Sequence, residues 1–159
     1  MDKKLLGIYI NDHLAGHVAG IELAKRSAGS NEGTPLGEFL EGFVAELQEE
    51  QQVMESALDA VDRDPSRLKT FGAWVAEKAG RFKLNGNVLA YSPLSRLLEL
   101  EAMVHGVSAK MDLWETLEKM DVDAGAAFGS LIERGERQRA TLKTHRHAAL
   151  SQAFAGSPS

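Results

Sequence analysis

Histidine and glutamate side chains are paired at helical spacing in three segments of this 159-residue sequence. The pairs are His13-x-x-x-His17, Glu46-x-x-x-Glu50 and Glu101-x-x-x-His105. Side chains at this spacing lie on the same face of an α-helix, so each pair would present its two polar groups together. Carboxylates combined with neutral imidazoles suit iron, manganese or zinc. These six residues are therefore the candidate metal ligands.

Four long helices are expected to position these pairs. Apolar residues recur at helical spacing, and no strand-like alternation of useful length competes with this pattern. Capping and helix-breaking residues place the ends, with Thr34 before Pro35, Pro65 after the second helix, and Ser92 before Pro93. The expected helices cover residues 3–27, 35–62, 92–120 and 124–154.

The segment between the second and third long helices is expected to hold a shorter helix at residues 66–80. The Asn85-Gly86 pair that follows favours a turn, and a small β-hairpin around it is the alternative. We expect residues 1–154 to form one domain and residues 155–159 to be a disordered tail.

Polar residues interrupt the apolar stripes of three of these helices. His13 and His17 interrupt the first stripe, Glu50 the second, and Gln138 and His145 the fourth. A polar side chain in a bundle core is costly unless it is hydrogen-bonded, paired or metal-bound. We therefore expect these groups to meet one another.

The remaining stripe and two small residues complete the expected packing. The stripe of the third helix consists of Leu97, Leu100, Val104, Val107, Met111 and Trp114. Gly20 and Gly135 lie on the first and fourth stripes, and we expect them to permit close approach of the helices.

The position of each polar residue along the bundle axis can be counted if the third helix runs parallel to the second. Counting from the end where the first helix stops then places His13, Glu50 and Gln138 in one layer. His17 and Glu46 fall in the next layer, about 6 Å away at ~1.5 Å of rise per residue. His105 lies close to that second layer, and Glu101 shares a third level with His145. A single cluster of carboxylates and imidazoles is the predicted result.

The short, long, short order of the connections is the connectivity of ferritin-like bundles. Over nearly the whole chain the order of elements resembles the ferritin-like superfamily, and "YSPLSRLLELEA" is similar to stretches of small bacterial members. The resemblance implies a core that holds one or two metal ions and a role in iron or oxidative-stress handling. The sequence departs from that family's ligand pattern because it contains no Glu-x-x-His. The resemblance therefore implies a variant site.

Two other interpretations stay open. His13 and His17 are also explained by hydrogen bonds to Glu50 and Glu46 in a metal-free polar network that sets the helix register. The protein would then be a non-catalytic interaction or stress-related bundle, with a homodimer through exposed apolar residues as one form. A bundle core also makes apolar pockets, so a small-molecule binding bundle is the third interpretation.

Composition limits the classes of function. The net charge of -5 argues against nucleic acid as a partner, and the absence of cysteine removes thiolate metal sites and thiol nucleophiles. No phosphate loop or nucleophile elbow is present, so no reaction is assigned. No stretch has the pattern of a signal peptide or a membrane span, and we expect a cytoplasmic protein without a membrane partner.

Overall fold

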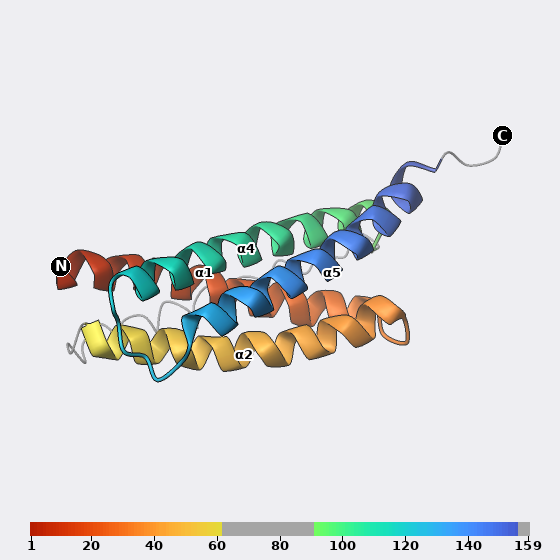
Figure 1. The fold of residues 1–159 in the computed structure, drawn as a ribbon. Helices are drawn as coiled ribbons and strands as arrows, with labels where there is room; N and C mark the ends of the chain where they lie inside the picture. The colour runs from red at the N-terminus through yellow and green to blue at the C-terminus, as the bar shows by residue number, and fades with distance from the viewer. Residues whose placement is uncertain (62–90, 156–159) are drawn as a thin grey trace.

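A computed structural model describes residues 1–61 and 91–155, and these residues form a four-helix bundle (Figure 1). The helices are α1 (Lys3–Ser30), α2 (Pro35–Val61), α4 (Pro93–Lys119) and α5 (Phe128–Phe154). The all-α bundle expected from the periodicity is confirmed for this part of the chain. The short helix at 66–80, the turn at 85–86 and all but the first residue of the predicted tail lie outside the described residues.

The predicted starts of the second and third long helices are confirmed by their caps. The Gly37 amide donates to Thr34 Oγ1 at 3.1 Å, and the Ser95 amide donates to Ser92 Oγ at 3.1 Å. In both cases a proline occupies the first helical position, where its missing N–H removes no helical hydrogen bond. None of these four helices is long and apolar enough to reach across a bilayer.

The last helix starts later than the sequence predicted. Phe128 begins α5, whereas the predicted start was residue 124. Asp121 and Gly125 adopt the left-handed conformation, with φ values of 53° and 68°, which ends helical structure on both sides of this loop. The Asp123 carboxylate accepts a hydrogen bond from the Gly125 amide at 3.1 Å and stabilises the turn. At the other end of the chain, α1 runs past its predicted end and continues to Ser30.

The helices pair as two antiparallel hairpins, with α1 packed along α2 and α4 packed along α5, and α1 also contacts α4. Figure 1 shows α2 and α4 running in the same direction. Two hydrogen bonds show that α1 and α4 run in opposite directions. Asn31 Nδ2, after the end of α1, donates to the Tyr91 hydroxyl, before the start of α4, at 2.8 Å. At the other end of the bundle the Tyr9 hydroxyl lies 3.5 Å from Thr116 Oγ1. The parallel arrangement assumed for the polar layers is therefore confirmed.

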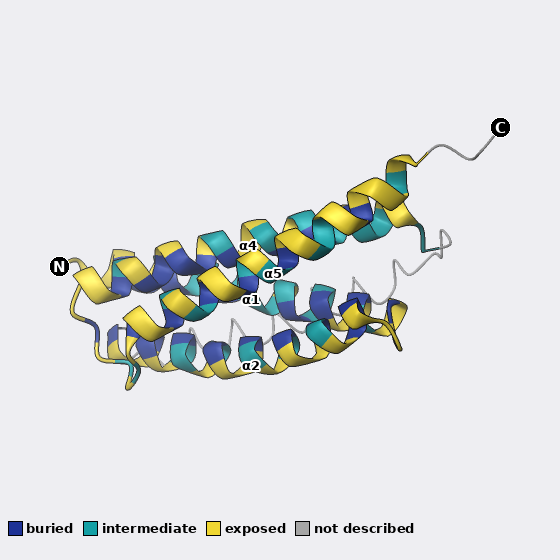
Figure 2. Cartoon of the chain, turned by 45° about the vertical axis from the view of Figure 1, so that its right-hand side comes forward, coloured by how far each residue is buried: buried dark blue, intermediate teal, exposed yellow. Residues whose placement is uncertain are grey.

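Buried residues line the facing sides of the helices along their length (Figure 2). They form two apolar clusters, one at each end of the bundle. The first cluster contains Ile10, Leu14, Met54, Trp114 and Phe128. The second contains Ile21, Leu40, Phe43, Leu100 and Leu142. A layer of polar side chains separates the two clusters.

Two glycines that were expected to permit close helix packing behave differently. A Cβ atom at Gly135 would lie 2.6 Å from Met111 Cγ, so α5 approaches α4 closely there, as predicted. A Cβ atom at Gly20 would meet nothing within 4 Å among the described residues. The prediction for Gly20 was wrong, because α1 borders open space at this position.

Candidate functional site

The polar layer is centred on three buried side chains from three helices. Glu50 of α2 is 0% exposed, and Lys110 of α4 and Gln138 of α5 are each 3% exposed. Lys110 Nζ donates to the Glu50 carboxylate and, at 2.7 Å, to Gln138 Oε1. A buried carboxylate and a buried ammonium thus neutralise each other, which is the condition under which charges are tolerated in a core.

Gln138 extends the network to a second carboxylate. Its Nε2 donates to Glu46 Oε2 at 2.6 Å and to Glu50 Oε1 at 3.3 Å. The amide therefore uses its oxygen for Lys110 and its nitrogen for the two glutamates, so its orientation is fixed by its partners. The predicted meeting of Glu50 and Gln138 in one layer is confirmed.

Burial shifts the titration of the central pair. Desolvation raises the pKa of Glu50, and the nearby charge of Lys110 opposes this shift. Desolvation lowers the pKa of Lys110, and Glu50 opposes that shift in turn. Burial alone therefore moves the two pKa values toward each other, which lowers the free-energy cost of moving the proton along their hydrogen bond.

His17 does not bond to a carboxylate. Its Nε2 lies 2.7 Å from the backbone oxygen of Leu47. Because a carbonyl oxygen only accepts hydrogen bonds, Nε2 carries the proton. Burial, with a smaller contribution from the charge of Lys110, lowers the pKa of His17 to about 4, so the ring is neutral at physiological pH. Nδ1 then presents a lone pair, and none of the described residues donates a hydrogen bond to it.

His13 lies one turn away on the same face of α1. It is half-buried, and its ring meets the edge of Tyr9 with the ring centroids 4.5 Å apart. Burial lowers the pKa of His13, while Asp112 and Asp12 oppose the shift. The metal-free interpretation paired His13 and His17 with Glu50 and Glu46. That pairing was wrong, because Lys110 and Gln138 take up the two carboxylates.

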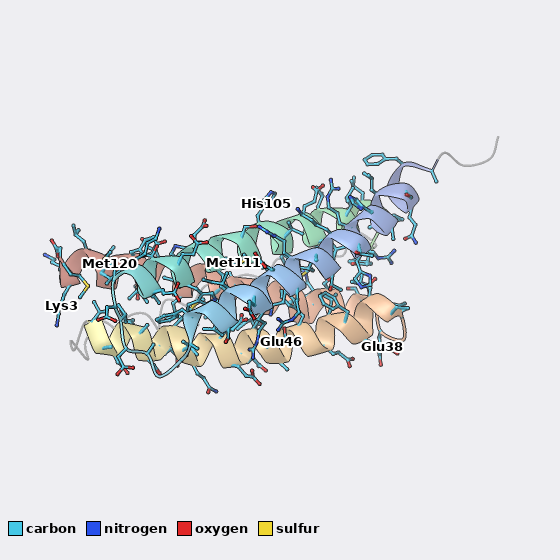
Figure 3. All side chains as sticks on the ribbon, viewed as in Figure 1. Lys3, Glu38, Glu46, His105, Met111 and Met120 are labelled. Carbon is cyan, nitrogen blue, oxygen red and sulfur yellow. The ribbon has the colours of Figure 1, made fainter. Side chains whose placement is uncertain are left out.

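The two candidate ligands on α4 lie away from the polar layer. Glu101 accepts from Arg146 of α5, with 2.7 Å between Glu101 Oε1 and Arg146 Nη2. His105 is exposed and projects from the outer face of α4, whereas Glu46 lies at the middle of α2 (Figure 3). His145, expected at the level of Glu101, stacks instead on Phe39 with ring centroids 5.3 Å apart. Glu101 and His105 are therefore not brought together with the other four candidates.

This donor set does not fit a dinuclear carboxylate centre. Such a centre needs carboxylates that bridge or chelate cations, but the cation between the helices here is the ammonium of Lys110. Within residues 1–61 and 91–155, no three His, Asp or Glu side chains are grouped so that they could hold a metal ion. Metal binding by the six candidate residues stays a prediction.

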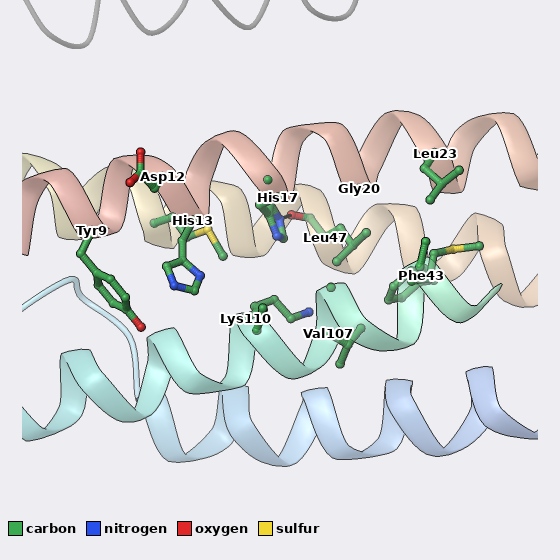
Figure 4. Close-up of a pocket in the computed structure, with 16 residues that line it drawn as sticks. Tyr9, Asp12, His13, His17, Gly20, Leu23, Phe43, Leu47, Val107 and Lys110 are labelled. Atoms are coloured by element: carbon green, nitrogen blue, oxygen red, sulfur yellow. Dashed lines mark hydrogen bonds between the residues drawn. The ribbon is translucent and has the colours of Figure 1, made fainter. Parts of the chain in front are cut away.

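A cavity of about 360 Å³ lies between α1 and α4, with α2 behind it (Figure 4), and it opens to solvent at the exposed residues Gly16, Ala102 and Gly106. Its walls are largely apolar, and they include Leu23, Phe43, Leu47, Met103 and Val107. The polar groups on its lining come from both helices, with Tyr9, Asp12, His13 and His17 on α1 and Lys110 on α4. Figure 4 shows Lys110 reaching from α4 into the space between the two helices, across from His17.

Small residues on the facing sides of α1 and α4 create this cavity. Gly16 and Gly20 line it from α1, and Ala102, Gly106 and Ala109 line it from α4. A Cβ atom added at Gly16, Gly20 or Gly106 would meet nothing within 4 Å among the described residues. Small residues thus leave space between α1 and α4, whereas Gly135 allows close contact between α4 and α5.

Sequence reasoning missed Lys110, although a signal for it exists. The sequence pattern assigned the apolar stripe of the third helix to Leu97, Leu100, Val104, Val107, Met111 and Trp114. The structure also buries a second stripe on α4, which consists of Met103, Val107, Lys110, Trp114 and Leu117. A lysine in a stripe of otherwise apolar residues is the natural partner for a glutamate in the opposite stripe.

Comparison with protein-family models, with curated proteins and with solved structures gives no match for this chain. The polar layer and the adjoining cavity are therefore the features from which a function can be inferred.

Proposed function

We propose that this protein binds a small, largely apolar molecule in the cavity between α1 and α4, on a bundle of ferritin-like connectivity. The observation that carries the proposal is the cavity of about 360 Å³ that combines apolar walls with the polar groups of half-buried His17 and buried Lys110. Convergent polar groups in an apolar pocket are typical of ligand sites. No reaction is part of this proposal.

The size of the cavity sets the size of the ligand. An engineered cavity of about 150 Å³ lined by apolar side chains binds benzene. The cavity here is about 360 Å³, which suits a molecule of two fused rings or an aliphatic chain of similar bulk. Apolar burial supplies the affinity at roughly 25 cal/mol per Å² of area removed from water, less the cost of immobilising the ligand.

The protonation state of His17 determines which polar group the ligand should carry. Nε2–H is used by Leu47, so the free ring nitrogen accepts a hydrogen bond and does not donate one. A ligand hydroxyl or N–H group satisfies this acceptor. We therefore propose an alcohol, a phenol or a similar uncharged donor as the preferred class of ligand.

The ferritin-like part of the proposal is supported by the chain path. Helix α2 ends at one end of the bundle, and α4 begins at the opposite end and runs parallel to it (Figure 1). One long crossover between two short-looped hairpins is the connectivity of ferritin-like folds. This likeness concerns topology, and the ligand is proposed from the cavity alone.

Calorimetric titration of the purified chain with 2-naphthol tests the proposal. We expect saturable binding and a rise in the melting temperature that grows with ligand concentration, because a ligand of the native state stabilises it. The blocked variant Gly20→Leu/Gly106→Leu places two large side chains in the cavity from opposite walls and should lose this binding.

The matched control is Gly42→Leu, which adds the same side chain at an exposed helical glycine of α2 with no neighbour within 4 Å. It should bind 2-naphthol as tightly as the unmodified protein. Absence of binding to the unmodified chain, or equal binding to the folded blocked variant, would contradict the proposal.

A further inference from the structure

We propose that Lys110 forms a reversible imine with small apolar aldehydes or ketones that enter the cavity between α1 and α4. The inference rests on the proposed function, because it assigns the carbonyl class of ligand to the same cavity. Its basis is the position of a buried primary amine on the cavity lining, in contact with a carboxylate and across from an imidazole.

Three features of Lys110 set it apart from the lysines on the surface of the described helices. Its side chain is 3% exposed, it lines the cavity, and its ammonium is held by two buried partners, Glu50 and Gln138. A lysine desolvated in an apolar pocket is the usual setting for an imine-forming amine. Surface lysines keep their ammonium groups hydrated and protonated.

The proton that the ammonium must lose has an acceptor already in contact with it. Transfer from Lys110 Nζ to the Glu50 carboxylate gives a neutral amine and a neutral acid, and no charge then remains in the buried pair. Burial favours this form, since desolvation raises the pKa of Glu50 and lowers that of Lys110. Gln138 keeps its bonds to both glutamates and so holds Glu50 in place.

The covalent steps balance without an oxidant or a reductant. The lone pair of the neutral amine forms a C–N bond to the carbonyl carbon as the C=O π bond opens, and one proton moves from the nitrogen to the oxygen to give a carbinolamine. The hydroxyl group and the second nitrogen proton then leave as water, which breaks the C–O bond and gives the neutral imine. His17 lines the same cavity, and its ring is uncharged. The ring lies close enough to Lys110 for the ammonium charge to lower the pKa of His17. Its Nδ1 lone pair would accept a hydrogen bond from the carbinolamine hydroxyl.

Trapping with 2-naphthaldehyde and cyanoborohydride at neutral pH tests the inference. The reductant converts an imine to a stable secondary amine, and peptide mapping by mass spectrometry then identifies the modified lysine. We expect Lys110 to be modified faster than the exposed Lys143 of α5, and an excess of 2-naphthol should protect Lys110 alone. Modification of surface lysines with Lys110 unmodified would overturn the inference.

Two variants separate this inference from the proposed function. The blocked variant Gly20→Leu/Gly106→Leu retains Lys110 and should lose its modification, with Lys143 modified as before. Lys110→Met removes the amine and should lose the adduct, with Lys143 modified as before. Binding of 2-naphthol without an adduct at Lys110 overturns the imine and leaves the binding function in place. Failure of 2-naphthol to bind overturns the binding function itself.

Discussion

Lys110 and Glu50 form an ion pair at the level where the two apolar clusters of the bundle meet. Their side chains are 3% and 0% exposed, so both charges are removed from water. Because Glu50 comes from α2 and Lys110 from α4, the pair links the two hairpins across the core. A shift of one helix by a turn would bury both charges without partners, so the pair selects the observed register.

Breaking the pair from one side should be costly. Lys110→Met leaves the Glu50 carboxylate buried without its cation, and we expect the free energy of unfolding to fall by about 3–5 kcal/mol. Glu50→Leu should have a similar effect because it isolates the ammonium. The double variant Glu50→Leu/Lys110→Met should unfold within about 1 kcal/mol of the unmodified protein. Urea denaturation of the four proteins gives the coupling, and additive losses would contradict a direct interaction.

Stability should fall in acid through His17. The unfolded chain protonates this ring near pH 6.5, whereas the native state holds its pKa at about 4. Between these values the unfolded state binds more protons, so the free energy of unfolding decreases as the pH is lowered, and the change levels off below about pH 4. The expected contribution is about 3 kcal/mol over this window.

The variant His17→Gln isolates this contribution, because glutamine keeps an N–H donor for Leu47 and does not titrate. Its stability should vary less with pH over the same window than that of the unmodified protein. His105→Gln changes an exposed histidine on α4 and serves as the control. An unchanged pH profile for His17→Gln would show that the ring is not held neutral in the native state.

The contact between Gly135 and Met111 predicts an asymmetry between two glycine substitutions. Gly135→Ala would place a methyl group 2.6 Å from Met111 Cγ, and we expect a loss of about 1–3 kcal/mol from overpacking. Gly42→Ala adds the same group with no neighbour within 4 Å and should gain up to about 1 kcal/mol through helix propensity. Thermal unfolding of both variants measures the difference. Equal effects would contradict the close approach of α5 to α4.

The occupied carboxylates predict how the protein responds to metal ions. Since Lys110 and Gln138 bond to Glu50 and Glu46, added iron, manganese or zinc should not raise the melting temperature in a way that depends on Glu50. Elemental analysis of protein purified without a His-tag, beside the Glu50→Ala variant, provides the check. Near-stoichiometric metal that disappears in the variant would restore the predicted metal site.

The helical architecture was accessible from sequence because it depends on local signals. Thr34 and Ser92 each precede a proline and cap a helix, and both caps are present in the structure. The start of α5 was misplaced because Gly125, inside the predicted helix, adopts the left-handed conformation, so the helix begins only at Phe128. Local chemistry therefore determined most helix ends and failed where one residue adopts an uncommon conformation.

The site was only partly accessible, because partner choice is a tertiary property. The burial of Glu50 was predicted from its place in an apolar stripe, but its partner Lys110 belongs to a second buried stripe on α4 that was not followed. His17 was expected to seek a carboxylate and instead bonds to the backbone oxygen of Leu47, which no sequence pattern specifies. The cavity was missed because Gly20 was interpreted as a close-packing residue, whereas the opposite helix stays away from it.

The most direct test of the account is a solution NMR measurement of contacts between bound 2-naphthol and the protein. We predict nuclear Overhauser effects from the naphthol ring protons to the methyl groups of Leu47, Met103 and Val107, which line the cavity between α1 and α4. Contacts confined to exposed side chains such as Leu98 or Phe154, or no contacts at saturating ligand, would contradict the assignment of this cavity as the binding site.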